Sequence, residues 1–183
     1  MNKGQRLAVI IDAAKELLKR GSWCGETHLQ KAIFILQELT EADTGFEFIL
    51  YKHGPFSFEL RDAITELAAD GLIEYVVRNP DYGPTLLPTS DSVVFLQRFP
   101  KTLSRYSEQI GFVADQLNDM GVSDLERLTT AVFVVKRLDQ LKEADRAREI
   151  TRLKPHISMS DANEAVGDAE KLIAKANSLL RSN

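Results

Sequence analysis

Apolar residues near the N-terminus recur at helical spacing and predict two helices. The first, over residues 5–20, has an apolar stripe made of Leu7, Ile10, Ile11, Ala14, Leu17 and Leu18, and Gly21 ends it. The second helix is predicted over residues 27–39, with Thr27 as its N-cap. Its middle, residues 32–36, is apolar on every side, which indicates burial on more than one face.

The pattern then changes to alternation followed by turn residues. Residues 46–51 are predicted to be extended, and the stretch Lys52-His53-Gly54-Pro55 is predicted to turn, because Pro disfavours helix at the residue before it. A third helix starts at Ser57, whose side chain can cap it. Its buried face is predicted to consist of Leu60, Ala63, Ile64, Leu67 and Ala68, and Gly71 ends the helix.

A hairpin-like pattern completes the first half of the chain. Strands predicted over residues 72–78 and 85–88 flank a loop rich in Asn, Pro and Gly, and Ser90 or Asp91 then caps a short helix. Helix, helix, strand, turn, helix, strand, loop, strand is an order typical of a winged helix-turn-helix. We therefore expect a winged-helix domain with a small β-wing over residues 1–98.

After Pro100 the chain is predicted to be helical throughout. Helices are expected over residues 102–118, 124–141, 144–153 and 160–180. Gly121 and the Lys154-Pro155 pair separate them, and Ser158 with Asp161 fits the capping-box pattern for the last helix. The predicted fold class is α+β, mostly α, with residues 99–183 forming a C-terminal helical region packed on the winged-helix domain.

The last helix carries small residues in a regular seam. Its members include Ala165, Ala169, Leu172 and Ala176. Small side chains permit close helix approach, but the repeat is too short for a convincing coiled coil. Packing on the C-terminal helices is the favoured interpretation, and a homodimer or partner interface through this seam is the alternative.

Composition restricts the class of protein. The chain has 183 residues, of which 44% are hydrophobic and 27% charged, as in ordinary globular proteins. No apolar run reaches the roughly 20 residues that span a bilayer, and no secretory signal is apparent, so we expect a cytoplasmic protein that does not enter the membrane. A single cysteine, Cys24, excludes an internal disulfide and a Cys-rich zinc site.

The distribution of charge favours a protein partner over DNA. Residues 1–98 hold 10 Lys+Arg against 14 Asp+Glu, and residues 99–183 hold 13 against 13. The third helix exposes Glu59, Asp62, Glu66 and Asp70 against Arg61, so phosphate would be repelled. An acidic helix suits a basic partner. The predicted partner-binding residues are Lys52, His53, Glu59, Asp62, Glu66 and Tyr82, while Phe56 and Phe58 either anchor the partner or fill the core.

If DNA is bound, the predicted contacts lie elsewhere. They are Arg78 in the wing, together with Arg148 and Arg152 in the most basic stretch of the chain. The spacing of Asp145 and Glu149 from these two arginines also predicts ion pairs within one helix, on a solvated face. The interpretation as ion pairs within one helix is favoured over DNA contacts.

Motifs for catalysis are missing from the sequence. His28, His53 and His156 lie far apart, and no HExxH, GxSxG, GxGxxG or Walker A pattern occurs. Nothing near Cys24 supplies a base, so a half-buried structural thiol is expected. We predict no catalytic, metal-binding or cofactor-binding residues and a non-enzymatic protein.

Four segments resemble one group of small prokaryotic proteins. They are Thr27-His28-Leu29-Gln30-Lys31, Tyr51-Lys52-His53-Gly54-Pro55-Phe56-Ser57, Asp124-Leu125-Glu126-Arg127-Leu128-Thr129-Thr130-Ala131 and Leu153-Lys154-Pro155-His156-Ile157-Ser158. Over most of its length the chain resembles the YwgA-like and SocA-antitoxin-like (Panacea) family, which implies a winged-helix-like fold.

The resemblance also implies a function. It implies a non-enzymatic protein from mobile or defence-associated gene neighbourhoods, in some cases an antitoxin or proteolytic adaptor that binds a toxin. We therefore expect an antitoxin, adaptor or accessory protein of a toxin–antitoxin or phage-defence system, with a basic toxin or defence subunit as partner. The alternative is a DNA-binding transcriptional regulator, in which dimerisation places two wings on an operator.

Overall fold

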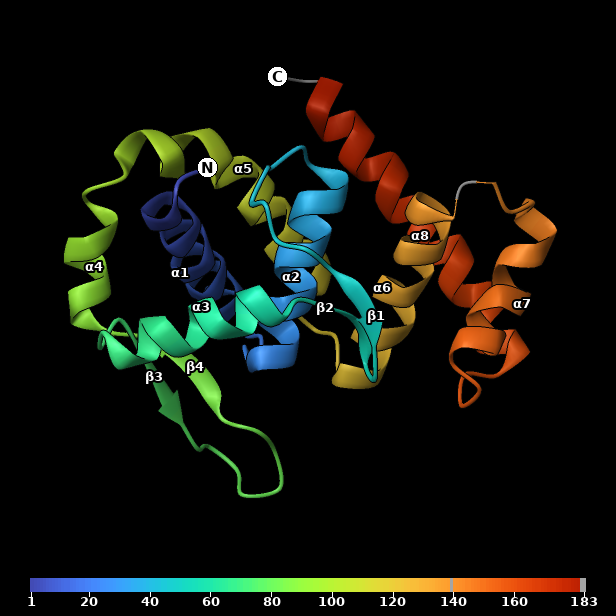
Figure 1. The fold of residues 1–183 in the computed structure, drawn as a ribbon, viewed down its shortest axis with the longest axis horizontal. Coiled ribbons are helices and arrows are strands. Elements are labelled where there is room, and N and C mark those ends of the chain that lie inside the picture. Colours follow the sequence, from blue (N-terminus) through green and yellow to red (C-terminus); the bar gives the residue numbers. More distant parts are fainter. Residues whose placement is uncertain (139, 182–183) are drawn as a thin grey trace.

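Helices make up most of the chain and two short hairpins the rest (Figure 1). The computed structural model describes residues 1–138 and 140–181. The elements are α1 (Lys3–Lys19), α2 (Glu26–Leu39), β1 (Ile49–Tyr51), β2 (Gly54–Phe56), α3 (Phe58–Ala69), β3 (Ile73–Val76), β4 (Thr85–Pro88), α4 (Ser90–Leu96), α5 (Pro100–Leu117), α6 (Val122–Arg137), α7 (Glu143–Leu153) and α8 (Met159–Arg181). The predicted class, α+β and mostly α, is confirmed.

The observed helices follow the predicted order, but several begin or end a few residues away from the predicted positions. The helix predicted over residues 124–141 ends at Arg137, where Leu138 is the C-cap, and residue 139 lies outside the described residues. Ser57 caps α3 as expected, since its Oγ accepts a hydrogen bond from the Leu60 N–H at 3.2 Å. The side chains of Ser158 and Asp161 also form the predicted cap contacts at the start of α8, because Ser158 Oγ accepts from the Asp161 N–H at 3.1 Å.

Two predicted caps are wrong. Helix α2 starts after Gly25, so Thr27 lies inside the first turn. Glycine fits there because a Cβ would lie 3.3 Å from the Pro84 carbonyl oxygen. Helix α4 starts after Thr89, ahead of both Ser90 and Asp91, because extended backbone at Thr89 lets its Oγ1 accept from the Ser92 N–H at 3.4 Å.

The segment between α2 and α3 forms a hairpin that the sequence did not predict. Strand β1 pairs antiparallel with β2, with Tyr51 opposite Gly54, so only Lys52 and His53 form the turn. The prediction that Gly54 and Pro55 belong to the turn is wrong, because both lie in β2. Gly54 is the first residue of β2 and adopts a φ of +84°, which lets the chain leave the turn and enter the strand.

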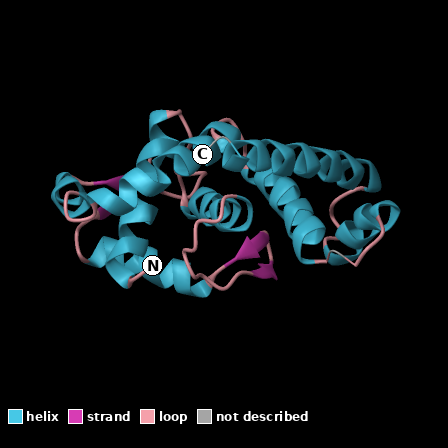
Figure 2. Ribbon diagram, turned by 90° about the horizontal axis from the view of Figure 1, so that it is seen from above, coloured by secondary structure: helices cyan, strands magenta, loops and turns pink. Residues whose placement is uncertain are grey.

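The second hairpin is close to the one predicted. Strands β3 and β4 pair antiparallel from Ile73 opposite Pro88 to Val76 opposite Thr85. The return strand has the predicted limits, whereas the first strand is shorter than residues 72–78. The two hairpins are separate sheets and lie apart in both views (Figures 1 and 2).

Helix α2 lies at the centre of the hydrophobic core. Leu29, Ile33, Phe34 and Ile35 on this helix are fully buried, as the all-apolar stretch predicted. Helices α1, α5 and α6 pack against α2, so both halves of the chain contribute to one core. Helix α7 lies at the end of the molecule opposite α4 (Figure 1). None of the described helices is long and apolar enough to cross a membrane.

The seam of α8 faces the chain's own helices. Ala165, Ala169, Leu172 and Ala176 are buried, and α8 packs mainly on α6 and α7. The seam is therefore used for packing on the C-terminal helices, the favoured one of the two interpretations. A homodimer through the same four residues would require α8 to leave its bundle, because one side chain cannot be covered by two neighbours at once.

Candidate functional site

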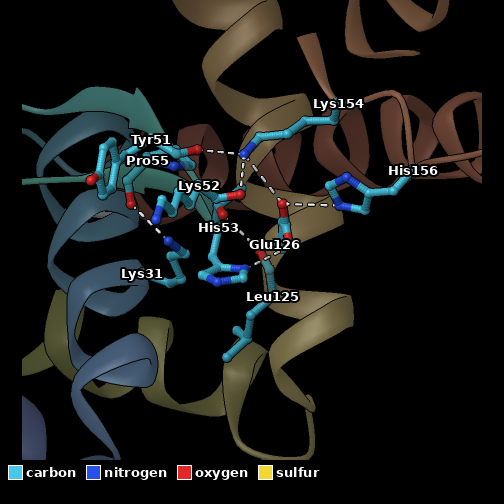
Figure 3. A network of polar contacts seen from close by, with 10 residues as sticks. Lys31, Tyr51, Lys52, His53, Pro55, Leu125, Glu126, Lys154 and His156 are labelled. Carbon is cyan, nitrogen blue, oxygen red and sulfur yellow. Dashed lines mark hydrogen bonds and ion pairs between the residues drawn. The ribbon is translucent and has the colours of Figure 1, made fainter.

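The four segments that carry the family resemblance meet around one buried carboxylate (Figure 3). Glu126 on α6 lies between the β1–β2 hairpin and the segment that follows α7. Lys31 comes from α2, His53 from the hairpin turn, and Lys154 and His156 from the chain after α7. Residues more than 120 positions apart in the sequence therefore share one polar network, which we call the Glu126 network.

Glu126 is contacted by three basic side chains. Its Oε1 lies 3.3 Å from Lys154 Nζ and 3.2 Å from His156 Nε2, and its Oε2 lies 3.5 Å from His53 Nδ1. Oε1 is buried, and neither of its two contacts has hydrogen-bond geometry. Both imidazoles are exposed, so the two histidines contact the carboxylate from the surface side. Lys154 is buried and contacts it from the interior.

The two lysines of the network hold the backbone of the hairpin. Lys154 Nζ donates to the carbonyl oxygens of Tyr51 and Lys52, the latter at 2.5 Å, and Lys31 Nζ donates to the carbonyl of Pro55 at 2.8 Å. Lys31 is 1% exposed. Burial lowers the pKa of Lys31 to about 8; the carboxylate of Glu126 opposes this shift and the ammonium of Lys154 adds to it.

Two further contacts fix the strand that leads into α3. The Gln30 side chain accepts from the Ser57 N–H and donates to the Ser57 carbonyl, both at 2.9 Å. Gly54 packs so closely on α6 that a Cβ would lie 3.1 Å from Thr130 Oγ1. Helices α2 and α6 therefore clamp the hairpin, and the hairpin sets the position at which α3 begins.

An exposed aromatic cluster lies on this clamped hairpin and the start of α3. It consists of Tyr51, Phe56 and Phe58, whose ring centroids are 5.1 to 5.7 Å apart. Tyr51 is 43% exposed and Phe58 42%, while Phe56 is half-buried beside them, so Phe58 does not serve to fill the core. The guanidinium of Arg61 lies over the Phe58 ring at 5.1 Å.

Four of the predicted partner-binding residues border this cluster. Lys52 and His53 follow Tyr51, Glu59 follows Phe58, and Asp62 lies one turn further along α3; all four are exposed. Glu66 is half-buried and paired instead with Lys3 of α1 at 2.6 Å. Tyr82 is not part of this surface, because it lies on the β3–β4 loop against Trp23, with ring centroids 5.4 Å apart.

The residues predicted to contact nucleic acid are not brought together. Arg78 lies on the β3–β4 loop, whereas Arg148 and Arg152 lie on α7 at the other side of the molecule (Figure 1). Both α7 arginines are paired along their own helix, Arg148 with Asp145 at 3.1 Å and Arg152 with Glu149 at 2.6 Å. The predicted ion pairs within α7 are present. The three arginines do not form one continuous basic surface.

Cys24 and His28 are both buried. Cys24 is fully buried, more than the half-buried thiol expected, and burial raises the pKa of its thiol to about 12. Burial also lowers the pKa of His28, which contacts the backbone of Met120. Among residues 1–138 and 140–181, no group of three or more His, Cys, Asp or Glu side chains is placed to hold a metal ion.

Sequence reasoning missed the centre of the site. Lys31 offered a signal, since it directly precedes the all-apolar stretch of α2 and a charge there has to be buried with a partner. Glu126 offered no such signal, because the polar and apolar residues around it follow the ordinary spacing of an amphipathic helix. No protein-family model matches the chain, and no curated protein matches it either.

Proposed function

We propose that this protein is a non-enzymatic protein-binding module, an antitoxin, adaptor or accessory subunit of a toxin–antitoxin or phage-defence system in the bacterial or archaeal cytoplasm. In this proposal residues 1–98 form a domain of winged-helix type, with α1, α2 and α3 as its helices and β3–β4 as its wing. The observation that carries the proposal is the exposed aromatic cluster of Tyr51, Phe56 and Phe58 on a hairpin clamped from beneath.

Rigid, exposed aromatic residues are suited to anchoring another protein. Aromatic side chains are enriched among the residues that dominate binding energy at interfaces. Here the backbone on either side of the hairpin turn is bound by Lys154 and Lys31, and the start of α3 is bound by Gln30. Because the surface is already ordered, little conformational entropy is lost when a partner binds.

The charge beside the cluster favours a basic partner. Helix α3 with its C-cap carries four carboxylates and one arginine, and that arginine is stacked on Phe58. The net charge of the chain is −4. Such a surface accelerates the encounter with a basic protein and repels the phosphates of DNA. A DNA-binding regulator, the second candidate, has the projecting β3–β4 hairpin in its favour but no basic surface among its three predicted arginines (Figure 1).

Capture from cells followed by reconstitution tests the proposal. The tagged chain is recovered from the cells it comes from, at low and moderate salt, with and without nuclease. We expect a stoichiometric protein that survives nuclease and binds the purified chain directly. Phe58→Ala should weaken that complex by tenfold or more, on the order of 2 kcal/mol, and Glu59→Lys should weaken it through charge repulsion.

The matched control is Val94→Ala, a truncation of another exposed apolar residue, on α4. It should leave the affinity unchanged. Recovery of DNA alone, lost on nuclease treatment, would replace the proposal with the regulator. A complex that tolerates Phe58→Ala as well as it tolerates Val94→Ala would show that the aromatic cluster is not the binding surface.

A further inference from the structure

A concave surface lies beside the loop of the β3–β4 hairpin. It is a pocket of about 610 Å³ between the hairpin loop, the start of α2 and the connection from α5 to α6. The volume is in the range of pockets that hold small ligands or a large side chain. Three aromatic residues line it, Trp23, Tyr75 and Tyr82, and none of them belongs to the aromatic cluster described above.

The aromatic wall is held in place by hydrogen bonds. Trp23 Nε1 donates to the carbonyl of Gly83 at 2.8 Å, and Thr85 Oγ1 donates to the carbonyl of Trp23 at 2.9 Å. The Trp23 and Tyr82 rings are tilted by 48° with centroids 5.4 Å apart. Both rings line the pocket, and the face of an aromatic ring attracts a cation through its quadrupole.

The charged side chains that line the pocket are acidic. Glu26 and Asp119 line it, and no lysine or arginine is among its described lining residues. Neither carboxylate has an ion-pair partner among the residues that the structure describes. His28 also lines the pocket, and because burial lowers its pKa the imidazole favours the neutral form.

The helix ends at the pocket do not reverse this charge. Helices α2 and α6 both begin here, and a helix N-terminus attracts anions. Glu26 lies in the first turn of α2 and Asp124 in the first turn of α6, so each positive helix end already has its own carboxylate. The negative end of α5, capped by Asn118, faces the same pocket. The field therefore favours a cation.

We propose that this pocket receives a basic side chain, arginine or lysine, of the partner protein. The inference rests on the proposed function and adds the chemistry by which the partner is recognised. The side chain's cationic head lies against the faces of Trp23 and Tyr82, and its N–H groups are shared between Glu26 and Asp119. The aliphatic stem of the side chain covers the remaining apolar wall.

Trp23 is the only tryptophan of the chain, so its fluorescence reports on the pocket directly. We expect acetyl-arginine amide to change this fluorescence in a saturable manner, with a response that weakens as salt is added. Acetyl-citrulline amide, neutral and nearly the same shape, should bind about tenfold more weakly. Equal responses to the two probes, or no saturable response to either, would overturn the inference.

Variants separate the pocket from general effects. Glu26→Gln combined with Asp119→Asn should raise the Kd for acetyl-arginine amide by about tenfold. Asp91→Asn is the matched control, because Asp91 is a carboxylate in the first turn of α4, as Glu26 is in that of α2, but lies outside the pocket. Unchanged affinity in the double variant would overturn the inference.

The captured partner distinguishes this inference from the proposed function. Tyr82→Ala should weaken the reconstituted complex about tenfold, and Tyr82→Phe, which keeps the ring, should not. A complex that depends on Phe58 but not on Tyr82 would leave the proposed function standing and remove the inference. Binding of acetyl-arginine amide without capture of any protein would remove the proposed function and assign the pocket to a small free cation instead.

Discussion

Lys31 and Lys154 bring two ammonium groups into the interior beside the single carboxylate of Glu126. Removing a charge from water is costly, and one carboxylate cannot fully compensate two ammonium groups. The backbone carbonyls of the β1–β2 hairpin supply the remaining acceptors. This arrangement stabilises one particular position of the hairpin rather than the protein as a whole.

The pH dependence of stability should reveal the cost of burying Lys31. The unfolded chain holds this proton up to a pH near its ordinary pKa of 10.5, and the folded chain only to about 8. Between these values the unfolded state binds more protons, so the free energy of unfolding rises with pH. From pH 7 to pH 9.5 wild type should gain about 2 kcal/mol relative to Lys31→Met, measured by urea unfolding.

Lys101→Met serves as the control, because Lys101 is exposed at the start of α5. It should follow the wild-type pH dependence. Parallel pH profiles for wild type and Lys31→Met would mean that Lys31 keeps an ordinary pKa when the protein is folded.

At the scale of elements, the β1–β2 hairpin is the feature that distinguishes this chain. The helices were predicted to within a few residues, because their apolar stripes and caps such as Ser57 act locally. The hairpin was missed because Gly54-Pro55 has the local signature of a turn. Contact with Thr129 and Thr130, some 75 residues away, holds that dipeptide in a strand instead. No local pattern contains this contact.

Two glycines with a positive φ allow the contact to be measured. Gly54 has a φ of +84° and Gly71 a φ of +70°, but only at Gly54 would an added Cβ have neighbours within 4 Å. Gly71→Ala should cost about 1 kcal/mol from backbone strain alone. Gly54→Ala should cost about 3 kcal/mol, since overpacking against Thr130 adds to the strain.

Chemical denaturation of both variants checks this difference. Equal losses in the free energy of unfolding would show that α6 moves away from the hairpin without cost. In that case the hairpin is not clamped, and the rigidity on which the proposed binding surface depends would be absent.

For the whole molecule, α2 connects the two halves. Residues 1–98 and 99–183 were predicted as a domain and a region packed on it, and α2 is covered by α1 from the first and by α5 and α6 from the second. The buried residues of both halves form a single cluster. Because the middle of α2, residues 32–36, is apolar on every side, the first half alone would expose a large apolar surface.

The chain should therefore unfold as one cooperative unit. Urea transitions followed by Trp23 fluorescence, which reports on the first half, and by far-UV circular dichroism, which reports on helices of both halves, should coincide. A fragment of residues 1–98 should show no cooperative transition. Two separated transitions, or a cooperatively folding fragment, would mean that the halves are independent domains.

The sequence by itself determined the helices, the β3–β4 hairpin, the helical second half and the acidic character of α3. Periodicity, caps and charge are local properties that can be read from neighbouring residues. The tertiary structure decided the rest: the Glu126 network, the clamped β1–β2 hairpin, the exposure of Tyr51 and Phe58, and the pocket around Trp23. Each depends on residues distant in the chain, and the burial of a charge or an aromatic ring is set by which element covers it.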